Sequence, residues 1–286
     1  MISLDREIRK YNITAVMYVR GKGSRFGGHE RRCLWPLCGK PMMQWTLEAA
    51  LASKYVNKVV LTSEDPEIIR IGEKIKGVMI VPRSLDTVLQ MPRGWNAGVF
   101  QRQRPRSLFS GDAFREPGGV SMGYRGPRDY VLWYLEEQES FVTDIDVEIP
   151  ANQPLGTVES LDKLIEAFFL DEEANKACTI YPISPNIYFV NPVTKELFPL
   201  WDDHGLDRQC YPFPLYRSGP FLIHGKPLKA TFSARDKIAY TIIPEEQGAD
   251  VHDKKDLEKA KYYLARRLEQ EKKSQEVSGV KRREVK

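Results

Sequence analysis

Two kinds of apolar pattern alternate along the first 81 residues, and this alternation restricts the fold more than any other feature. Short apolar runs rich in β-branched residues, typical of strands covered on both faces, are separated by segments with helical spacing. A strand–helix–strand–helix–strand order predicts a mostly parallel sheet with right-handed crossovers, an α/β domain. The strands are expected at 13–19, 57–63 and 78–81, and the helices at 41–53 and from 65 to about 77.

After this region the pattern is interrupted. Residues 83–128 hold eight arginines among many glycines and prolines, which predicts a long irregular insertion. We expect one domain over 1–270, with an extension at 185–218 for substrate binding or dimerisation, and a charged tail at 271–286, of which residues 274–286 are expected to fray. Further helices are expected at 129–138, 157–169 and 256–273, and further strands at 143–149, 178–181, 187–190, 219–225 and 239–244.

The composition is that of an ordinary globular protein. Of the 286 residues 42% are apolar, which supports a core, and a net charge of +4 does not by itself indicate a nucleic-acid partner. The four cysteines include no CxxC pair, so free thiols are expected rather than a zinc site. The N-terminus lacks the apolar core of a signal peptide, and no apolar run approaches the roughly 18 residues of a membrane span. We therefore predict a cytoplasmic protein without a membrane partner.

The loop after the first strand is the first candidate site. It leaves the carboxyl end of that strand, where open α/β sheets bind ligands, and its glycines allow close approach to a phosphate. The spacing fits neither the P-loop nor the GxGxxG motif, so a solvated basic turn remains the alternative. The residues concerned are Arg20, Gly21, Lys22, Gly23, Ser24, Arg25, Arg31 and Arg32.

An acidic stretch before the last helix is the second candidate site. Asp250, His252 and Asp253 follow a predicted strand, and carboxylates at such a junction can hold Mg²⁺ together with substrate phosphates. His252 is a better ligand for softer ions, which makes Mn²⁺ the alternative metal. Helix capping by Asp250 or Asp253 is the competing interpretation.

Two further segments carry polar side chains at strand ends. In PANQPLG (150–156), the amides of Asn152 and Gln153 could bind a base or a sugar, or they could only form a turn. In DRQCYPFPLYRSGP (207–220), arginines that can grip a carboxylate alternate with aromatics that could equally belong to a core or a dimer contact. The candidate substrate-binding residues there are Arg208, Gln209, Arg217 and Ser218.

Together these segments resemble the acylneuraminate cytidylyltransferases (CMP-sialic acid synthetases), a family of nucleotidyltransferases. The resemblance extends over about residues 13–265 and is most specific in ERRCLWPLCGKPMMQWTLEAALAS followed by NKVVLTSEDPEIIRIGEKI. PANQPLGTVESLDKLIEAF, DRQCYPFPLYRSG and IIPEEQGADVHDKKDLEKA resemble later segments of the family.

The resemblance implies a Rossmann-like three-layer α/β/α fold and a CTP-dependent reaction. A hydroxyl of a sugar acid or similar small acid attacks the α-phosphate of CTP, or of another nucleoside triphosphate, and pyrophosphate leaves. It further implies Mg²⁺ as cofactor and a homodimer formed through residues 185–215. By this resemblance, the catalytic residues would be Arg20, Arg32 and Asp250, and the metal would be held by Asp250, His252 and Asp253. The acceptor would be bound by Arg208, Gln209, Arg217 and Ser218. The nucleotide would be bound by Arg20, Gly21, Gly23, Ser24, Arg25, Arg32, Asn152 and Gln153.

Several motif positions depart from the family pattern. This chain has Arg32-Cys33 where the family has Lys-Asn, and Pro150 where the family has Gln. It also has Gly156 where the family has Arg, and His252 where the family has Asp. These departures leave a second hypothesis open, a non-catalytic relative that binds a nucleotide or a sugar within a complex. A third and weaker hypothesis is RNA binding through the arginines and aromatics of residues 93–128.

Overall fold

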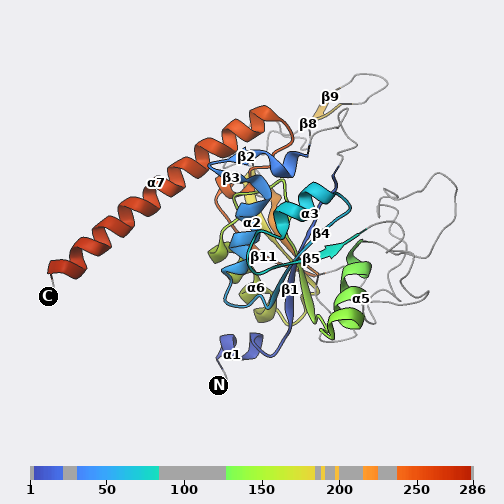
Figure 1. Cartoon of the computed structure of the whole chain (residues 1–286). Helices are drawn as coiled ribbons and strands as arrows, with labels where there is room; N and C mark the ends of the chain where they lie inside the picture. Colours follow the sequence, from blue (N-terminus) through green and yellow to red (C-terminus); the bar gives the residue numbers. More distant parts are fainter. Residues whose placement is uncertain are drawn as a thin grey trace.

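A mostly parallel seven-stranded sheet forms the centre of the computed structural model of this chain (Figure 1). The structure describes residues 3–21, 31–83, 127–183, 188–190, 197–199, 215–224 and 237–284. The sheet has the order β11-β7-β10-β6-β1-β4-β5; β10 is antiparallel to both neighbours and the other pairings are parallel. The strands are β1 Ile13–Tyr18, β4 Lys58–Ser63, β5 Val78–Pro82, β6 Ile145–Glu148, β7 Lys176–Ile183, β10 Leu215–His224 and β11 Ile238–Ile242. The predicted α/β class is confirmed.

The central strands are buried on both faces. In β1, Ala15 and Met17 point into the larger core cluster, while Val16 points to the opposite face and joins a second cluster. In β4, Leu61 and Val60 divide between the two clusters in the same way. This double burial explains why both strands appear in the sequence as continuous apolar runs instead of alternating patterns.

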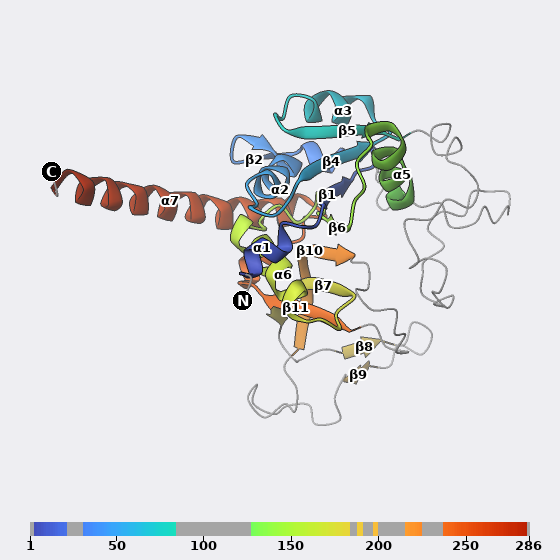
Figure 2. The same cartoon turned by 90° about the horizontal axis from the view of Figure 1, so that it is seen from below.

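Helices cover the two faces and produce a three-layer arrangement (Figure 2). Side chains of α2, α3 and α6 pack into the larger core cluster, and those of α5 pack on the opposite face. The guanidinium of Arg128 in α5 donates to both carboxylate oxygens of the buried Asp146 in β6, at 2.8 and 2.5 Å. The helices are α1 Leu4–Ile8, α2 Met42–Leu51, α3 Pro66–Gly72, α5 Pro127–Glu139, α6 Val158–Leu170 and α7 Lys254–Glu284.

Local capping explains where α3 and α6 begin. The Asp65 carboxylate accepts hydrogen bonds from the backbone N–H groups of Glu67 and Ile68, and proline occupies the first turn of α3. The Thr157 hydroxyl accepts from the N–H of Ser160 at the start of α6. Both helix starts agree with the sequence prediction.

A short hairpin precedes α2. Its strands β2 (Pro36–Leu37) and β3 (Lys40–Pro41) are joined by Cys38 and Gly39, whose φ angles are 44° and 87°. Positive φ at both turn residues is typical of the tight type I′ turn of two-residue hairpins. The Trp45 indole donates to the Leu37 carbonyl at 2.8 Å and holds the hairpin on α2.

The last helix is longer than predicted. We expected it to end near residue 273 and the tail beyond 273 to fray, but α7 continues to Glu284 and extends away from the sheet (Figures 1 and 2). Leu257, Ala260 and Leu264 in its first half pack against the hairpin residue Leu37 and against Leu155. The second half holds no proline and many Lys, Glu and Gln residues, so its helix propensity is enough to continue the helix.

Other element boundaries also differ from the prediction. Helix α3 ends at Gly72 and turns fill the residues up to Gly77, while α1 was not predicted. Strand β10 begins at Leu215 rather than 219, and its register with β7 shifts between Ser218 and Leu222, where glycine and proline interrupt the apolar pattern. The predicted strand at 187–190 is β8 (Tyr188–Val190), which pairs with β9 (Leu197–Pro199) outside the main sheet.

Two expectations fall on segments that the structure leaves out. The arginine-rich insertion, apart from Arg83, Pro127 and Arg128, lies outside the described residues, as does most of the 185–218 extension with its expected dimer contact. Both stay predictions. Within the described ranges, no helix is both long and apolar enough to span a membrane.

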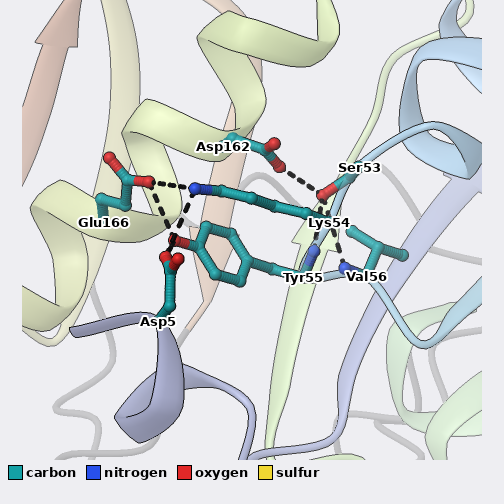
Figure 3. Close-up of polar contacts among 7 residues, drawn as sticks. All are labelled: Asp5, Ser53, Lys54, Tyr55, Val56, Asp162 and Glu166. Atoms are coloured by element: carbon teal, nitrogen blue, oxygen red, sulfur yellow. Dashed lines mark hydrogen bonds and ion pairs between the residues drawn. The ribbon is translucent and has the colours of Figure 1, made fainter. Parts of the chain in front are cut away.

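A polar cluster joins α1, α6 and the segment before β4 (Figure 3). The Tyr55 hydroxyl lies within hydrogen-bonding distance of the Asp5 carboxylate and 2.8 Å from that of Glu166, and Lys54 Nζ lies 2.9 Å from Glu166. Hydrogen bonding to Tyr55, and then to Glu166, raises the pKa of Lys54. Lys54 and Tyr55 directly precede β4, so the cluster lies at the amino-terminal edge of the parallel strands, opposite the candidate site.

The two cysteines near the first candidate loop should differ strongly in reactivity. Cys33 is buried in the larger core cluster, and burial raises the pKa of its thiol to about 12, whereas Cys38 is exposed in the hairpin turn. Because the thiolate is the reactive form, iodoacetamide at pH 8 should label Cys38 at least about tenfold faster than Cys33 in the folded protein. Peptide mass spectrometry measures both rates. Similar rates in guanidinium are the control, and similar rates in the folded protein would contradict the burial of Cys33.

Candidate functional site

The parallel strands bring the predicted site segments to one edge of the sheet. The carboxyl ends of β1, β4, β5 and β6 lie at the same edge because these strands are parallel. Arg20 and Gly21 follow β1, and Asn152 follows β6. The middle of the first loop, with Gly23, Ser24 and Arg25, lies outside the described residues, and so do Arg208 and Gln209. Their proposed roles stay predictions.

Asp250 is the centre of a hydrogen-bonded cluster. Its Oδ1 accepts from Asn152 Nδ2 at 2.5 Å, and its Oδ2 lies 3.0 Å from His252 Nε2 and 3.3 Å from Arg217 Nη2. The side chain of Asp250 is 14% exposed, whereas that of Arg217 is 56% exposed. The carboxylate is thus covered, while two of the side chains that it holds, Arg217 and His252, are exposed to solvent. An arrangement of this kind can bind an anion.

The cluster is tied to the first loop through Arg32. Arg32 Nη1 donates to the His252 carbonyl at 2.7 Å, and the N–H of Val251 donates to the Asn152 carbonyl at 2.8 Å. Arg32 lies in a 3₁₀ turn, Arg32–Leu34, directly after the loop. The structure therefore brings five of the predicted site residues into one connected group: Arg32, Asn152, Arg217, Asp250 and His252.

Two of the predicted site residues, Ser218 and Gln153, are neighbours of this group in the chain but make no side-chain contact with it that the structure describes. Ser218 follows Arg217 in β10, where successive side chains point to opposite faces; it is opposite Ile180, whereas Arg217 is opposite Tyr181. The carbonyl of Gln153 accepts from the Thr46 hydroxyl at 3.4 Å. Neither contact decides their roles in substrate or nucleotide binding, which stay predictions.

The residues predicted to hold a metal ion are engaged in other contacts. Asp253 Oδ1 accepts from the N–H of Asp256, and Asp256 Oδ2 accepts from the N–H groups of His252 and Asp253, a reciprocal cap at the start of α7. Both oxygens of Asp250 accept hydrogen bonds, as described above. No group of three or more His, Cys, Asp or Glu side chains in the described part of the chain is placed to hold a metal ion. These residues do not form a ready site for Mg²⁺ or Mn²⁺, and their role as ligands stays a prediction.

Acidic residues at the end of β4 contact the chain on both sides of the first loop. Glu64 Oε1 accepts from the N–H of Gly21 at 2.8 Å, and Asp65 Oδ2 accepts from Arg31 Nε at 2.8 Å. Burial acts to raise the pKa of Asp65, but the Arg31 guanidinium and the N–H groups of Glu67 and Ile68 outweigh it and the pKa is lowered. Glu64 was not among the predicted site residues. Its position at the carboxyl end of a strand is the signal that could have identified it.

Gly156 is fixed by close packing. A Cβ atom there would lie 2.6 Å from Cζ of Phe221 and 2.9 Å from Cγ of Pro220. Phe221 is fully buried in β10. The arginine that the family resemblance places at this position has no room in this structure.

Comparison with known proteins shows similarity to cytidylyltransferases. Residues 20–91 match the cytidylyltransferase family model. Over 57 residues the chain is 37% identical to a 3-deoxy-manno-octulosonate cytidylyltransferase of Synechococcus elongatus, a segment covering 20% of this chain and 22% of that protein. Over 45 residues it is 38% identical to a 2-C-methyl-D-erythritol 4-phosphate cytidylyltransferase of Parasynechococcus marenigrum, covering 16% and 20%. The matched segments thus span about a fifth of these relatives.

Solved structures of similar fold extend the likeness along most of the chain. A CMP:2-keto-3-deoxy-manno-octonic acid synthetase complexed with CTP has a TM-score of 0.55 at 14% identity, covering 90% of this chain and 99% of that one. A 4-diphosphocytidyl-2C-methyl-D-erythritol synthase from Anaerococcus prevotii has a TM-score of 0.53 at 13% identity, covering 91% and 99%. Neither is an acylneuraminate enzyme, so that finer resemblance stays a prediction. The chain therefore resembles the cytidylyltransferases in sequence over residues 20–91 and shares their Rossmann-like α/β fold.

Proposed function

We propose that this chain is a CTP-dependent nucleotidyltransferase that couples CTP to a small acidic acceptor and releases pyrophosphate. The observation that carries this proposal is the cluster around Asp250. The hydrogen bond from Arg32 to the His252 carbonyl connects this cluster to the residues directly after the first loop. The family match begins at Arg20, in the segment that leaves β1. Both segments lie at the edge of the sheet where α/β proteins bind nucleotides.

In the proposed reaction, a hydroxyl of the acceptor attacks the α-phosphorus of CTP in line. The new bond joins this oxygen to the α-phosphorus, and the hydroxyl proton is lost to solvent. The bond from the α-phosphorus to the oxygen that bridges to the β-phosphate breaks, and pyrophosphate departs with that electron pair. Arg20 and Arg32 stabilise charge on the phosphates, and Asn152 and Gln153 lie on the side of the base or sugar. The exposed guanidinium of Arg217, held at one end by Asp250, binds the carboxylate or phosphate of the acceptor. Each of these functions is positioning or electrostatic, as phosphoryl-type transfer requires.

A pyrophosphate-release assay tests this proposal. The full chain is incubated with each of the four nucleoside triphosphates, MgCl₂ or MnCl₂, and a panel of acceptors that includes sugar acids and 2-C-methylerythritol phosphate. We expect release that requires both CTP and one acidic acceptor, at a kcat of about 1 s⁻¹ or more. Pyrophosphate release with no combination, from protein that melts cooperatively, would contradict the proposal.

A non-catalytic nucleotide-binding relative is the second candidate function. The packing of Gly156 against Phe221 favours it, because a side chain of the family pattern cannot be accommodated there. Isothermal titration calorimetry separates the two functions. Binding of CTP without turnover of any acceptor would support the second candidate and overturn the first.

A further inference from the structure

The last helix carries a positive charge that the rest of the chain does not share. Helix α7 contains 11 of the 43 Lys and Arg residues of the chain, but only 6 of its 39 Asp and Glu residues. The helix therefore has a net charge of +5, and the remaining residues together have a net charge of −1. Because α7 extends away from the sheet (Figures 1 and 2), this charge lies on an element that a large partner can reach.

Part of this charge is arranged along one side of α7. Four residues follow one another at the spacings that place side chains on one face of a helix: Lys255, Lys259, Tyr262 and Arg266. We call these four residues the outer stripe. Each of them is two positions, about 200° around the helix, from Leu257 or Leu264, which are buried against the hairpin. The outer stripe therefore faces away from the domain, and all four of its residues are exposed.

The cations of the outer stripe form no ion pair among the residues that the structure describes. Other cations of α7 are paired within the helix, as Lys261 is with Glu258 at 2.6 Å and Lys273 is with Glu269 at 2.7 Å. Such a mixture of both signs is typical of a solvated helix face. The outer stripe holds three cations and no acid, so its charge can be neutralised by an external anion.

Tyr262 adds an aromatic surface between these cations. It is 59% exposed. Arg266 Cζ lies 5.7 Å from the centre of its ring, and the centre of the Tyr263 ring lies 5.8 Å from it. These contacts hold the ring on the helix surface and leave more than half of the residue accessible. Exposed rings beside cations are what proteins use to bind single-stranded nucleic acids, with phosphates on the cations and bases stacked on the rings.

We propose that the outer stripe of α7 is a binding surface for single-stranded nucleic acid. Lys255, Lys259 and Arg266 bind phosphates of the strand, and Tyr262 stacks on an unpaired base. This role goes beyond the proposed nucleotide transfer and does not depend on it.

Two other anionic partners fit the outer stripe less well. A helix that binds a membrane surface buries its apolar face in the lipid, but the apolar face of α7, with Leu257, Ala260 and Leu264, is buried in the protein. A duplex offers phosphates, but its bases are stacked inside it, so Tyr262 could not stack on them. A single strand complements both the cations and the ring.

Fluorescence anisotropy with a labelled oligonucleotide tests the proposal on the full chain. The probe is a single-stranded RNA of about 12 nucleotides, a length within the range of known single-strand sites. We expect a Kd of about 10 µM at low salt. The slope of log K against log[KCl] should be about −2, because binding neutralises three phosphates.

Two variants test the two parts of the surface. The triple variant Lys255→Gln/Lys259→Gln/Arg266→Gln keeps good helix formers, and it should bind at least about tenfold more weakly with a salt slope near zero. Tyr262→Ala should bind about tenfold more weakly with the slope unchanged, because it removes a stacking surface but no charge.

The matched control is Arg70→Gln/Lys74→Gln/Lys76→Gln, which removes three exposed cations in and just after α3 and should change the affinity by no more than about twofold. Equal losses in the control and in the triple variant of the outer stripe would reduce the effect to net charge and overturn the proposal. Unchanged affinity of both stripe variants would overturn it as well, and so would tighter binding of the corresponding duplex or of vesicles that contain anionic lipid. Circular dichroism identifies a variant that fails to fold, and the other stripe variant then decides.

Discussion

Replacement of Asp250 by alanine is expected to lower kcat/KM for CTP-dependent pyrophosphate release by about a hundredfold or more. The carboxylate holds side chains from three separate segments: Asn152 after β6, Arg217 in β10 and His252 before α7. Without it, Arg217, which binds the proposed acceptor, and Asn152, on the side of the base or sugar, lose their fixed geometry. A misplacement of about 1 Å at such a site is enough to account for this loss.

Steady-state kinetics on the full chain test this expectation. Asp250→Asn keeps a carbonyl oxygen that can accept one of the three donors, and it should retain more activity than the alanine variant. Glu246→Gln is the control, because Glu246 is an exposed carboxylate in the 3₁₀ turn just before Asp250 and its side chain has no contact in the Asp250 cluster. Full activity of the alanine variant, at unchanged melting temperature, would remove Asp250 from the site.

The fold was predictable wherever one short-range signal decided an element. Apolar runs identified β1 and β4, and an N-cap followed by proline identified α3. The start of strand β10 was missed because the polar residues Arg217 and Ser218 interrupt its apolar pattern; the pairing of residues 215–218 with β7, which is distant in sequence, determines that start. The length of α7 was missed because its second half has helix propensity but few apolar residues in its sequence.

The site was predictable in outline but not in its contacts. Parallel strands place their carboxyl ends together, so convergence of the Asn152 and Asp250 segments could be expected. The particular pairs could not be predicted, because Asn152 is 98 residues from Asp250 and Arg217 is 33 residues away. Their contacts depend on the order of the sheet and on the register of β10. Glu64 was missed for a related reason: its partners Gly21 and Arg83 follow two other strands, β1 and β5.

Phe221→Ala should produce the largest loss of stability, about 3–5 kcal/mol in the free energy of unfolding. Phe221 is fully buried in β10, and its N–H donates to the Thr179 hydroxyl at 3.1 Å in the neighbouring strand. Truncation removes the ring from the larger core cluster and leaves a cavity beneath the segment that follows Asn152. Urea denaturation followed by circular dichroism measures the change, and Tyr216→Ala, a truncation at a 39% exposed position of the same strand, is the control.

A second substitution at Gly156 shows whether the ring and the glycine are coupled. Gly156→Ala in the unaltered chain should destabilise the fold by about 1–3 kcal/mol, because its Cβ would lie 2.6 Å from the Phe221 ring. In the Phe221→Ala background the ring is absent, and most of this penalty should disappear, although Pro220 still limits the space. The two effects should therefore be strongly non-additive. Additive losses would mean that the penalty at Gly156 does not come from the Phe221 ring but from other contacts such as Pro220, whose Cγ would lie 2.9 Å from the added Cβ.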